Sequence, residues 1–178
     1  MATRCYRSID IVHAGSPLSG FGSTQRGGRY NRKNTFEAYY VARSRRTALL
    51  EVGAIASVRG VVHAVSGRAL LTVDVRLRNV LDLRDPSVRA HLGVSLSDLY
   101  APWLTEQTNR RFPLTQRIGE AARRERFEAI LAPSDADKPD GWNLVVIPET
   151  MMRGSRVSST TLSPGRLPFV PEILRGRM

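Results

Sequence analysis

The stretch Leu71-Thr-Val-Asp-Val-Arg-Leu-Arg78 alternates apolar and polar side chains at every position. Successive side chains of an extended chain point to opposite sides, so Leu71, Val73, Val75 and Leu77 share one face. The other face carries hydroxyl and charged groups that suit water. The pattern predicts a strand with one face on a hydrophobic core, as is common in antiparallel sheets.

Segments on both sides of this strand predict further elements. Short apolar, β-branched or aromatic runs indicate strands at Ala38–Ala42, Val61–Val65, Ala129–Ala132 and Leu144–Ile147. Apolar residues at helical spacing predict helices over Ser44–Ala56 and Leu114–Glu128, and one or two short helices over Pro86–Tyr100. The Gly- and Ser-rich segment Ile9–Asn34 predicts an ordered loop without a helix. Because strands and helices do not alternate regularly, the predicted class is α+β, a single domain of small mixed sheets with flanking helices.

Length and composition narrow the function classes. The chain has 178 residues, enough for one domain with a sizeable core. Its single cysteine, Cys5, excludes a disulfide framework, and the three histidines lack metal-ligand spacing, so we expect no metal site. No stretch approaches the roughly 20 apolar residues of a membrane span, and residues 1–12 lack the apolar core of a signal peptide. We therefore expect a cytoplasmic protein without a membrane partner.

The net charge is the unusual feature of the composition. Against 16 acidic residues stand 27 basic ones, giving a formal +11, and 25 of the basic residues are arginine. Residues 1–50 hold nine basic and two acidic side chains, and residues 151–178 hold five and one. Such a charge attracts polyanions, so nucleic acid, an acidic protein and a phosphate-bearing ligand all remain open. We predict that residues 153–178, which are basic and contain prolines, form a partly irregular tail.

Three stretches carry residue types that suit chemistry. In Gly27-Gly-Arg-Tyr-Asn31, glycines let backbone approach a ligand, Arg29 offers a planar fork for phosphate and Tyr30 an aromatic face. Glu51 lies beside the apolar stripe of its helix, which predicts a partly buried carboxylate with a partner or a task. Ser134 follows a predicted core strand without a nucleophile elbow, which favours binding over covalent catalysis. Each stretch also has a purely structural alternative. These are a tight turn for Gly27–Asn31, a pairing of Glu51 with a nearby arginine, and a turn role for Ser134.

Seven short runs follow one another along the chain: Leu18-Ser-Gly20, Gly27-Gly-Arg-Tyr-Asn31, Tyr40, Ala48-Leu-Leu-Glu51, Ile118-Gly119, Ile130-Leu-Ala-Pro-Ser134, and Asn143 with Pro148. Their order and spacing resemble the RES family, the toxins of RES–Xre toxin–antitoxin pairs, named for an arginine, a glutamate and a serine. Two positions depart from the family pattern. Tyr30 stands where tryptophan is common and keeps an aromatic face. Asn34 stands where the family commonly has a glycine, and asparagine can also adopt the left-handed turn conformation.

The resemblance implies an NAD-binding catalytic domain in residues 1–152, similar in fold to ADP-ribosyltransferase toxins. NAD would be the substrate, with no permanently bound cofactor and no metal. The roles that the resemblance implies are catalysis by Glu51 and Arg29, and substrate binding by Arg29, Tyr30, Asn31, Tyr40 and Ser134. The implied partner is a cognate Xre-like antitoxin, and nucleic acid would be bound only indirectly through it.

Cleavage of the nicotinamide–ribose bond develops positive charge on the ribose, which a nearby carboxylate stabilises. The acceptor stays open among water, inorganic phosphate and a protein side chain, so a mono-ADP-ribosyltransferase is one alternative. A non-catalytic nucleic-acid-binding module is a more distant one, because only Arg29-Tyr30 and Arg111-Phe112 approach a basic and aromatic pattern. A RES-like protein without activity is not favoured, since all the named positions are retained.

Overall fold

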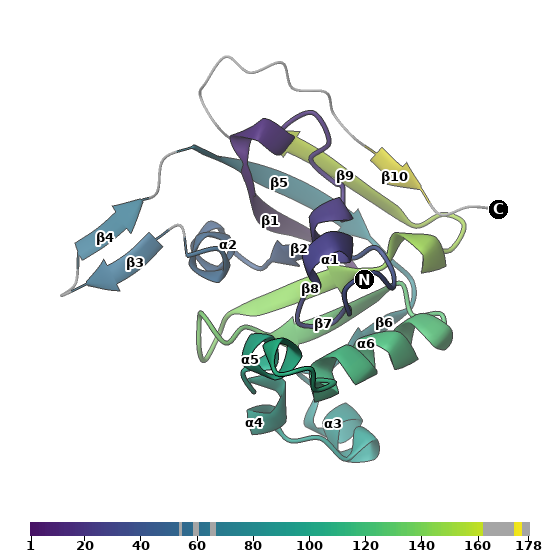
Figure 1. The fold of residues 1–178 in the computed structure, drawn as a ribbon. Helices are drawn as coiled ribbons and strands as arrows, with labels where there is room; N and C mark the ends of the chain where they lie inside the picture. Colours follow the sequence, from purple (N-terminus) through teal and green to yellow (C-terminus); the bar gives the residue numbers. More distant parts are fainter. Residues whose placement is uncertain (54, 59–60, 65–66, 162–172, 176–178) are drawn as a thin grey trace.

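One eight-stranded sheet organises the computed structural model, which describes residues 1–53, 55–58, 61–64, 67–161 and 173–175. The strand order is β10-β9-β5-β1-β2-β8-β7-β6 (Figure 1). The strands are β1 (Ala2–Asp10), β2 (Tyr39–Ala42), β5 (Arg68–Arg76), β6 (Val80–Asp82), β7 (Ala129–Pro133), β8 (Trp142–Val146), β9 (Arg156–Thr161) and β10 (Ile173–Arg175). Among these, β6 and β7 pair in parallel, and the other neighbours are antiparallel.

The alternating stretch forms most of β5 and confirms its predicted orientation. Leu71, Val73 and Val75 are at most 3% exposed, whereas Asp74 and Arg76 face solvent. β5 pairs with β1 over nine positions on one side and with β9 over six positions on the other. β5 therefore pairs with β1 and β9 along its two edges, and one of its faces is partly exposed to solvent.

The sheet opens between β1 and β2. These neighbours share one register pair, Tyr6 with Ala42, while β1 otherwise follows β5 and β2 follows β8. Because most of their length is unpaired with each other, the two halves of the sheet diverge at this point. The opening creates the cavity described below.

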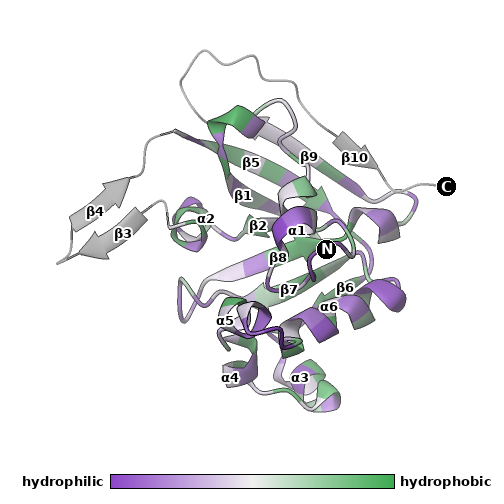
Figure 2. Cartoon of the chain, in the orientation of Figure 1, coloured by the Kyte–Doolittle hydropathy of each residue, from purple (hydrophilic) through white to green (hydrophobic). Residues whose placement is uncertain are grey.

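The helices gather mainly on the β6–β8 half of the sheet (Figure 1). They are α1 (Phe21–Arg26), α2 (Arg45–Glu51), α3 (Pro86–Leu92), α4 (Leu96–Leu99), α5 (Trp103–Thr108), α6 (Leu114–Arg124) and the short 3₁₀ turns η1 (Ile11–His13) and η2 (Pro148–Thr150). Ile130, Ala132 and Val145 share a hydrophobic cluster with Leu99 of α4 and Ile118 of α6. In Figure 2, β7 is accordingly largely apolar and α6 is mixed, as expected for a helix with one buried stripe.

The opposite face of the sheet holds a second hydrophobic cluster. It joins Leu131 and Leu144 of the β7–β8 pair to Leu71, Val73 and Cys5 of the β5–β1 pair. Burial raises the pKa of the Cys5 thiol to about 12, as expected for an inert core cysteine. Because β7 and β8 are covered on both faces, the predictions of short core strands at these positions are confirmed.

Several sequence-based boundaries are corrected by the structure. The predicted helix Ser44–Ala56 begins as expected, with the Ser44 hydroxyl capping Thr47 N, but it ends at Glu51. Gly53 takes a positive φ of 60°, which stops the helix, and the β-branched segment beyond it forms β3 (Ile55–Val58), paired with β4 (Val61–Ala64). Val65 of the predicted strand lies outside the described residues.

Several other elements also differ from the predictions. β1, α1 and α5 are present where no strand or helix was predicted, and the expectation of a loop without a helix over Ile9–Asn34 is wrong at α1. α6 ends at Arg124, before Arg126 with its positive φ of 62°. α1 has six residues, too few to show an apolar period in a Gly- and Ser-rich segment.

The predicted α+β class is confirmed, with eight strands in one larger mixed sheet and, among the described residues, only β3 and β4 in a separate small sheet. β9 lies beyond the predicted boundary at residue 152 and pairs with β5 in this sheet. The division into residues 1–152 and 153–178 therefore stays a prediction. Within the described ranges, none of the helices has the length and apolar character needed to cross a membrane.

Candidate active site

A cavity of about 440 Å³ lies where β1 and β2 diverge. This volume is in the range of small-molecule sites. Its wall includes Tyr6–Ser8 of β1, Tyr40–Ala42 of β2, Glu51 of α2 and residues of α1, α5, β7 and β8. Arg29, Tyr30, Tyr40 and Glu51, all predicted site residues, line this one cavity.

Glu51 is held by two side chains that come from the far end of the sequence. Its Oε1 accepts a hydrogen bond from Ser134 Oγ at 2.6 Å and another from Asn143 Nδ2 at 2.5 Å. No hydrogen bond to Oε2 is found within the described part of the chain, so one carboxylate oxygen is open to a ligand. Glu51 is exposed rather than partly buried as predicted, because it is the last residue of α2, at the cavity wall.

Ser134 is itself oriented by a buried network. Its side chain, in a residue only 1% exposed, donates to Glu51 and accepts from Asp137 N at 3.1 Å. Asp137 Oδ2 in turn accepts from Thr47 Oγ1 at 2.6 Å, which ties α2 to the loop between β7 and β8. α2, which carries Glu51, and the loop that carries Ser134 are thus held together by a second contact besides the Glu51–Ser134 hydrogen bond.

The hydrogen bond from Thr47 lowers the pKa of Asp137, with a smaller contribution from Arg46. A lowered pKa stabilises the fold above the ordinary value of 3.8, and this stabilisation is lost as the pH falls. We therefore expect Thr47→Val to destabilise the protein by about 1 kcal/mol at pH 7. Because protonation of Asp137 at acid pH removes the charged acceptor of this hydrogen bond, the difference from the wild type should shrink when the comparison is repeated at acid pH. Urea unfolding at the two pH values measures it, and an equal difference at both would contradict the assignment.

The Gly27–Asn31 loop is shaped by Tyr40. The Tyr40 hydroxyl accepts from Tyr30 N at 2.9 Å and donates to Asn31 Oδ1 at 2.8 Å. A Cβ on Gly28 would lie 2.4 Å from that hydroxyl, so a glycine is needed at this position. Burial raises the pKa of the Tyr40 hydroxyl, which therefore stays protonated and able to donate.

We expect Tyr40→Phe to lower stability by about 1–3 kcal/mol, because it leaves the Tyr30 N–H and the side-chain Oδ1 of Asn31 without their partner. For a chain of this size, this loss of stability corresponds to a decrease in the melting temperature of roughly 2–12 °C. Tyr100→Phe is the matched control, since no hydrogen bond of the Tyr100 hydroxyl is found among the described residues. Equal melting temperatures of the two variants would show that the Tyr40 hydroxyl does not hold the loop.

The other predicted binding residues lie deeper than expected. Asn31 is 0% exposed, does not line the cavity and donates from Nδ2 to Ser23 O at 2.9 Å. Tyr30 touches the cavity but is 2% exposed and packs in the cluster under α6. Both residues shape the loop in the structure, and their predicted contact with a substrate stays a prediction. Asn34, in the same segment, has a φ of 59°, which confirms the predicted left-handed conformation.

Four residues of this site were given no role by the sequence patterns. Arg7, Arg26 and Trp103 line the cavity, and Asn143 binds Glu51. Asn143 was noticed as part of the family pattern, and the other three come from elements that the sequence did not predict. Within the described residues, no group of three or more histidine, cysteine, aspartate or glutamate side chains could hold a metal ion.

Taken together, these features define an α+β domain with one cavity, lined by three arginines and by a carboxylate that a buried serine holds. The family model of the RES domain matches residues 4–169, so the chain belongs to the RES domain family. Among curated proteins, the NAD(+) phosphorylase MbcT of Mycobacterium tuberculosis and that of Mycobacterium bovis are each 31% identical over 134 residues. Those matches cover 73% of this chain and 66% of each relative, slightly under two thirds of its length.

A solved structure supports the same placement. The crystal structure of the M. tuberculosis MbcT–MbcA toxin–antitoxin complex contains a chain that superposes on this one with a TM-score of 0.66 at 28% identity. The superposition covers 92% of this chain and 86% of that one. The architecture described above is therefore shared across most of both chains.

Proposed function

We propose that this protein is an enzyme that cleaves the nicotinamide–ribose bond of NAD with inorganic phosphate as the acceptor. The observation that carries the proposal is the Glu51 carboxylate, fixed by Ser134 and Asn143 on the wall of a cavity that three arginines also line. The choice of NAD and phosphate is supported by the relatives named NAD(+) phosphorylase.

The chemistry suits these groups. Breaking the bond from ribose C1′ to the nicotinamide nitrogen leaves its electron pair on nicotinamide and positive charge on the ribose. The Glu51 carboxylate, oriented through Oε1, stabilises that charge electrostatically, because its position is set before the reaction. A phosphate oxygen then bonds to C1′, giving free nicotinamide and ADP-ribose 1″-phosphate. Arginine charge on the cavity wall favours the pyrophosphate there, which keeps the reacting bond in place.

We further propose that the enzyme acts as a toxin that depletes NAD and is held inactive by a cognate antitoxin protein. The related chain in a toxin–antitoxin complex supports this role. The formal charge of +11 would speed association with an acidic partner surface.

The test is to incubate the purified protein with NAD, with and without phosphate, and to separate the products by chromatography with mass detection. Phosphate-dependent formation of nicotinamide and ADP-ribose 1″-phosphate is the expected result. ADP-ribose formed equally without phosphate would make the enzyme a glycohydrolase, and label transferred from NAD to a protein would make it an ADP-ribosyltransferase. An unchanged NAD pool would overturn the enzymatic proposal.

A further inference from the structure

The guanidinium of Arg29 is largely engaged within the protein. Its Nη1 donates to the carbonyl oxygens of Leu99 at 2.7 Å and Ala101 at 2.9 Å, and its Nη2 lies 3.4 Å from Asp135 Oδ2. The side chain is 20% exposed. Arg29 therefore fixes the segment that leads from α4 into α5, and only part of it faces the cavity.

α5 is tied to the glycine-rich loop by a second set of contacts. Gln107 Nε2 donates to Arg26 O at 3.1 Å, and Gln116 Nε2 donates both to Gln107 Oε1 at 2.7 Å and to Gly28 O at 3.0 Å. These bonds hold α5 beside the residues that line the cavity. The first residue of α5, Trp103, consequently stands in the cavity wall with a half-buried indole.

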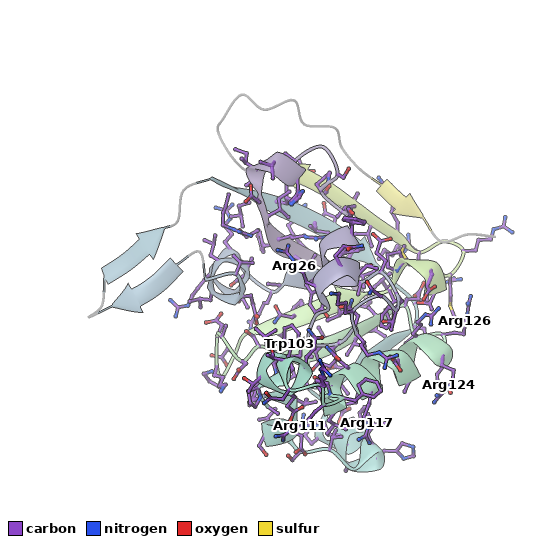
Figure 3. The ribbon with its side chains drawn as sticks, in the orientation of Figure 1. Arg26, Trp103, Arg111, Arg117, Arg124 and Arg126 are labelled. Carbon is purple, nitrogen blue, oxygen red and sulfur yellow. The ribbon has the colours of Figure 1, made fainter. Side chains whose placement is uncertain are left out.

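Arg26 provides a cation on the wall of the same cavity. It is exposed and takes part in none of the ion pairs found in the described ranges. Figure 3 shows Arg26 at α1 and Trp103 at α5, whereas Arg111, Arg117, Arg124 and Arg126 lie along α6 and the turns next to it. The wall of this cavity therefore carries one indole and one guanidinium for which no ion pair is found among the described residues.

The indole and the Glu51 carboxylate reach the cavity from separate elements. Glu51 ends α2, which packs on β1 and β2, whereas α5 lies beside α6 (Figure 1). A dinucleotide has a reacting half and a remote half, and binding of the remote half positions the reacting bond. The cavity offers residues suited to both halves.

We propose that Trp103 and Arg26 form a subsite for the adenine nucleotide half of the substrate, and this rests on the proposed function. The indole stacks on adenine, which presents a flat aromatic face. The Arg26 guanidinium binds the pyrophosphate through charge-assisted hydrogen bonds. Arg29 acts here as a positioning residue, because it holds the chain that places Trp103.

The test is calorimetric binding of ADP, which carries adenine and both phosphates but no nicotinamide. We expect wild-type protein to bind ADP and Trp103→Ala to bind it about tenfold or more weakly, since loss of base stacking has effects of this size. Trp103→Phe should retain most of the affinity. Leu104→Ala is the matched control, because Leu104 is exposed on the same helix and does not line the cavity.

Arg26→Gln should weaken ADP about tenfold while leaving the weaker binding of adenosine unchanged. Arg110→Gln, an exposed arginine outside the cavity, is its control and should bind both like the wild type. Absence of ADP binding, or equal affinities of wild type, Trp103→Ala and Arg26→Gln, would overturn the subsite.

The two proposals fail differently. If NAD is consumed but ADP binding does not depend on Trp103, the enzyme stands and the subsite is wrong. If ADP binding depends on Trp103 but NAD is not consumed, the nucleotide subsite stands and the proposed reaction is wrong. When both hold, Trp103→Ala should raise KM for NAD more than it lowers kcat.

Discussion

Replacing Glu51 by glutamine is expected to lower the rate of NAD consumption by about 10²- to 10³-fold, the effect of losing one preorganised electrostatic group. Glutamine keeps the shape of the side chain, and its carbonyl oxygen can still accept from Ser134 Oγ and Asn143 Nδ2. The variant therefore removes the negative charge and little else. The measurement is the initial rate of nicotinamide release at saturating NAD and phosphate.

The control for this variant is Glu125→Gln, which neutralises an exposed carboxylate just past α6 and outside the cavity. It should have wild-type activity. Glu51→Gln should also melt close to the wild-type temperature, because Glu51 is exposed and surface substitutions usually change stability by less than about 0.5 kcal/mol. A folded Glu51→Gln protein that retains more than a tenth of the wild-type rate would remove Glu51 from the mechanism.

Replacing Gly119 by alanine is expected to produce the largest loss of stability. A Cβ at this position would lie 1.6 Å from Tyr30 O and 2.6 Å from Tyr30 C, both backbone atoms that cannot rotate away. Alanine favours a helix over glycine by about 1 kcal/mol. Overpacking of this severity outweighs that gain, so we expect a net loss of about 3 kcal/mol. The melting temperature should fall by roughly 6–12 °C.

The consequence of Gly119→Ala should extend to the cavity, because Tyr30 N donates to the hydroxyl of Tyr40. Gly15→Ala is the matched control, since a Cβ on Gly15 would meet nothing within 4 Å. Thermal unfolding followed by circular dichroism compares the two. If they melt at the same temperature, the close approach of α6 to the loop is not a feature of the protein.

Some elements of the fold could be predicted from local features of the sequence, and others could not. The alternation in Leu71–Arg78 was sufficient to orient β5, because a period of two describes a local backbone geometry. The Ser44 cap was also predicted, since its hydrogen bond closes within three residues. The end of α2 was not, because a pattern of apolar spacing does not say that Gly53 turns the chain.

The candidate site was predicted in part. Glu51 and Ser134, 83 positions apart, were singled out from the residue types and the family resemblance, and they are in direct hydrogen-bond contact. The predicted substrate contacts of Asn31 and Tyr30 remain predictions, and both residues are buried in the loop that they shape. Trp103 and Arg26 were missed, because they belong to six-residue helices that the sequence patterns did not reveal.

The sequence by itself determined the core face of β5, the short strands β7 and β8, and the residue types of the site for which we propose NAD as the substrate. The strands follow from local periodicity, and the residue types of the site follow from the order of the short motifs along the chain. Only the tertiary structure decided that β1 and β2 share a single register pair, so that a cavity opens between them. It alone also decided that Arg29 binds the carbonyls before α5, because long-range contacts follow from packing and not from spacing along the chain.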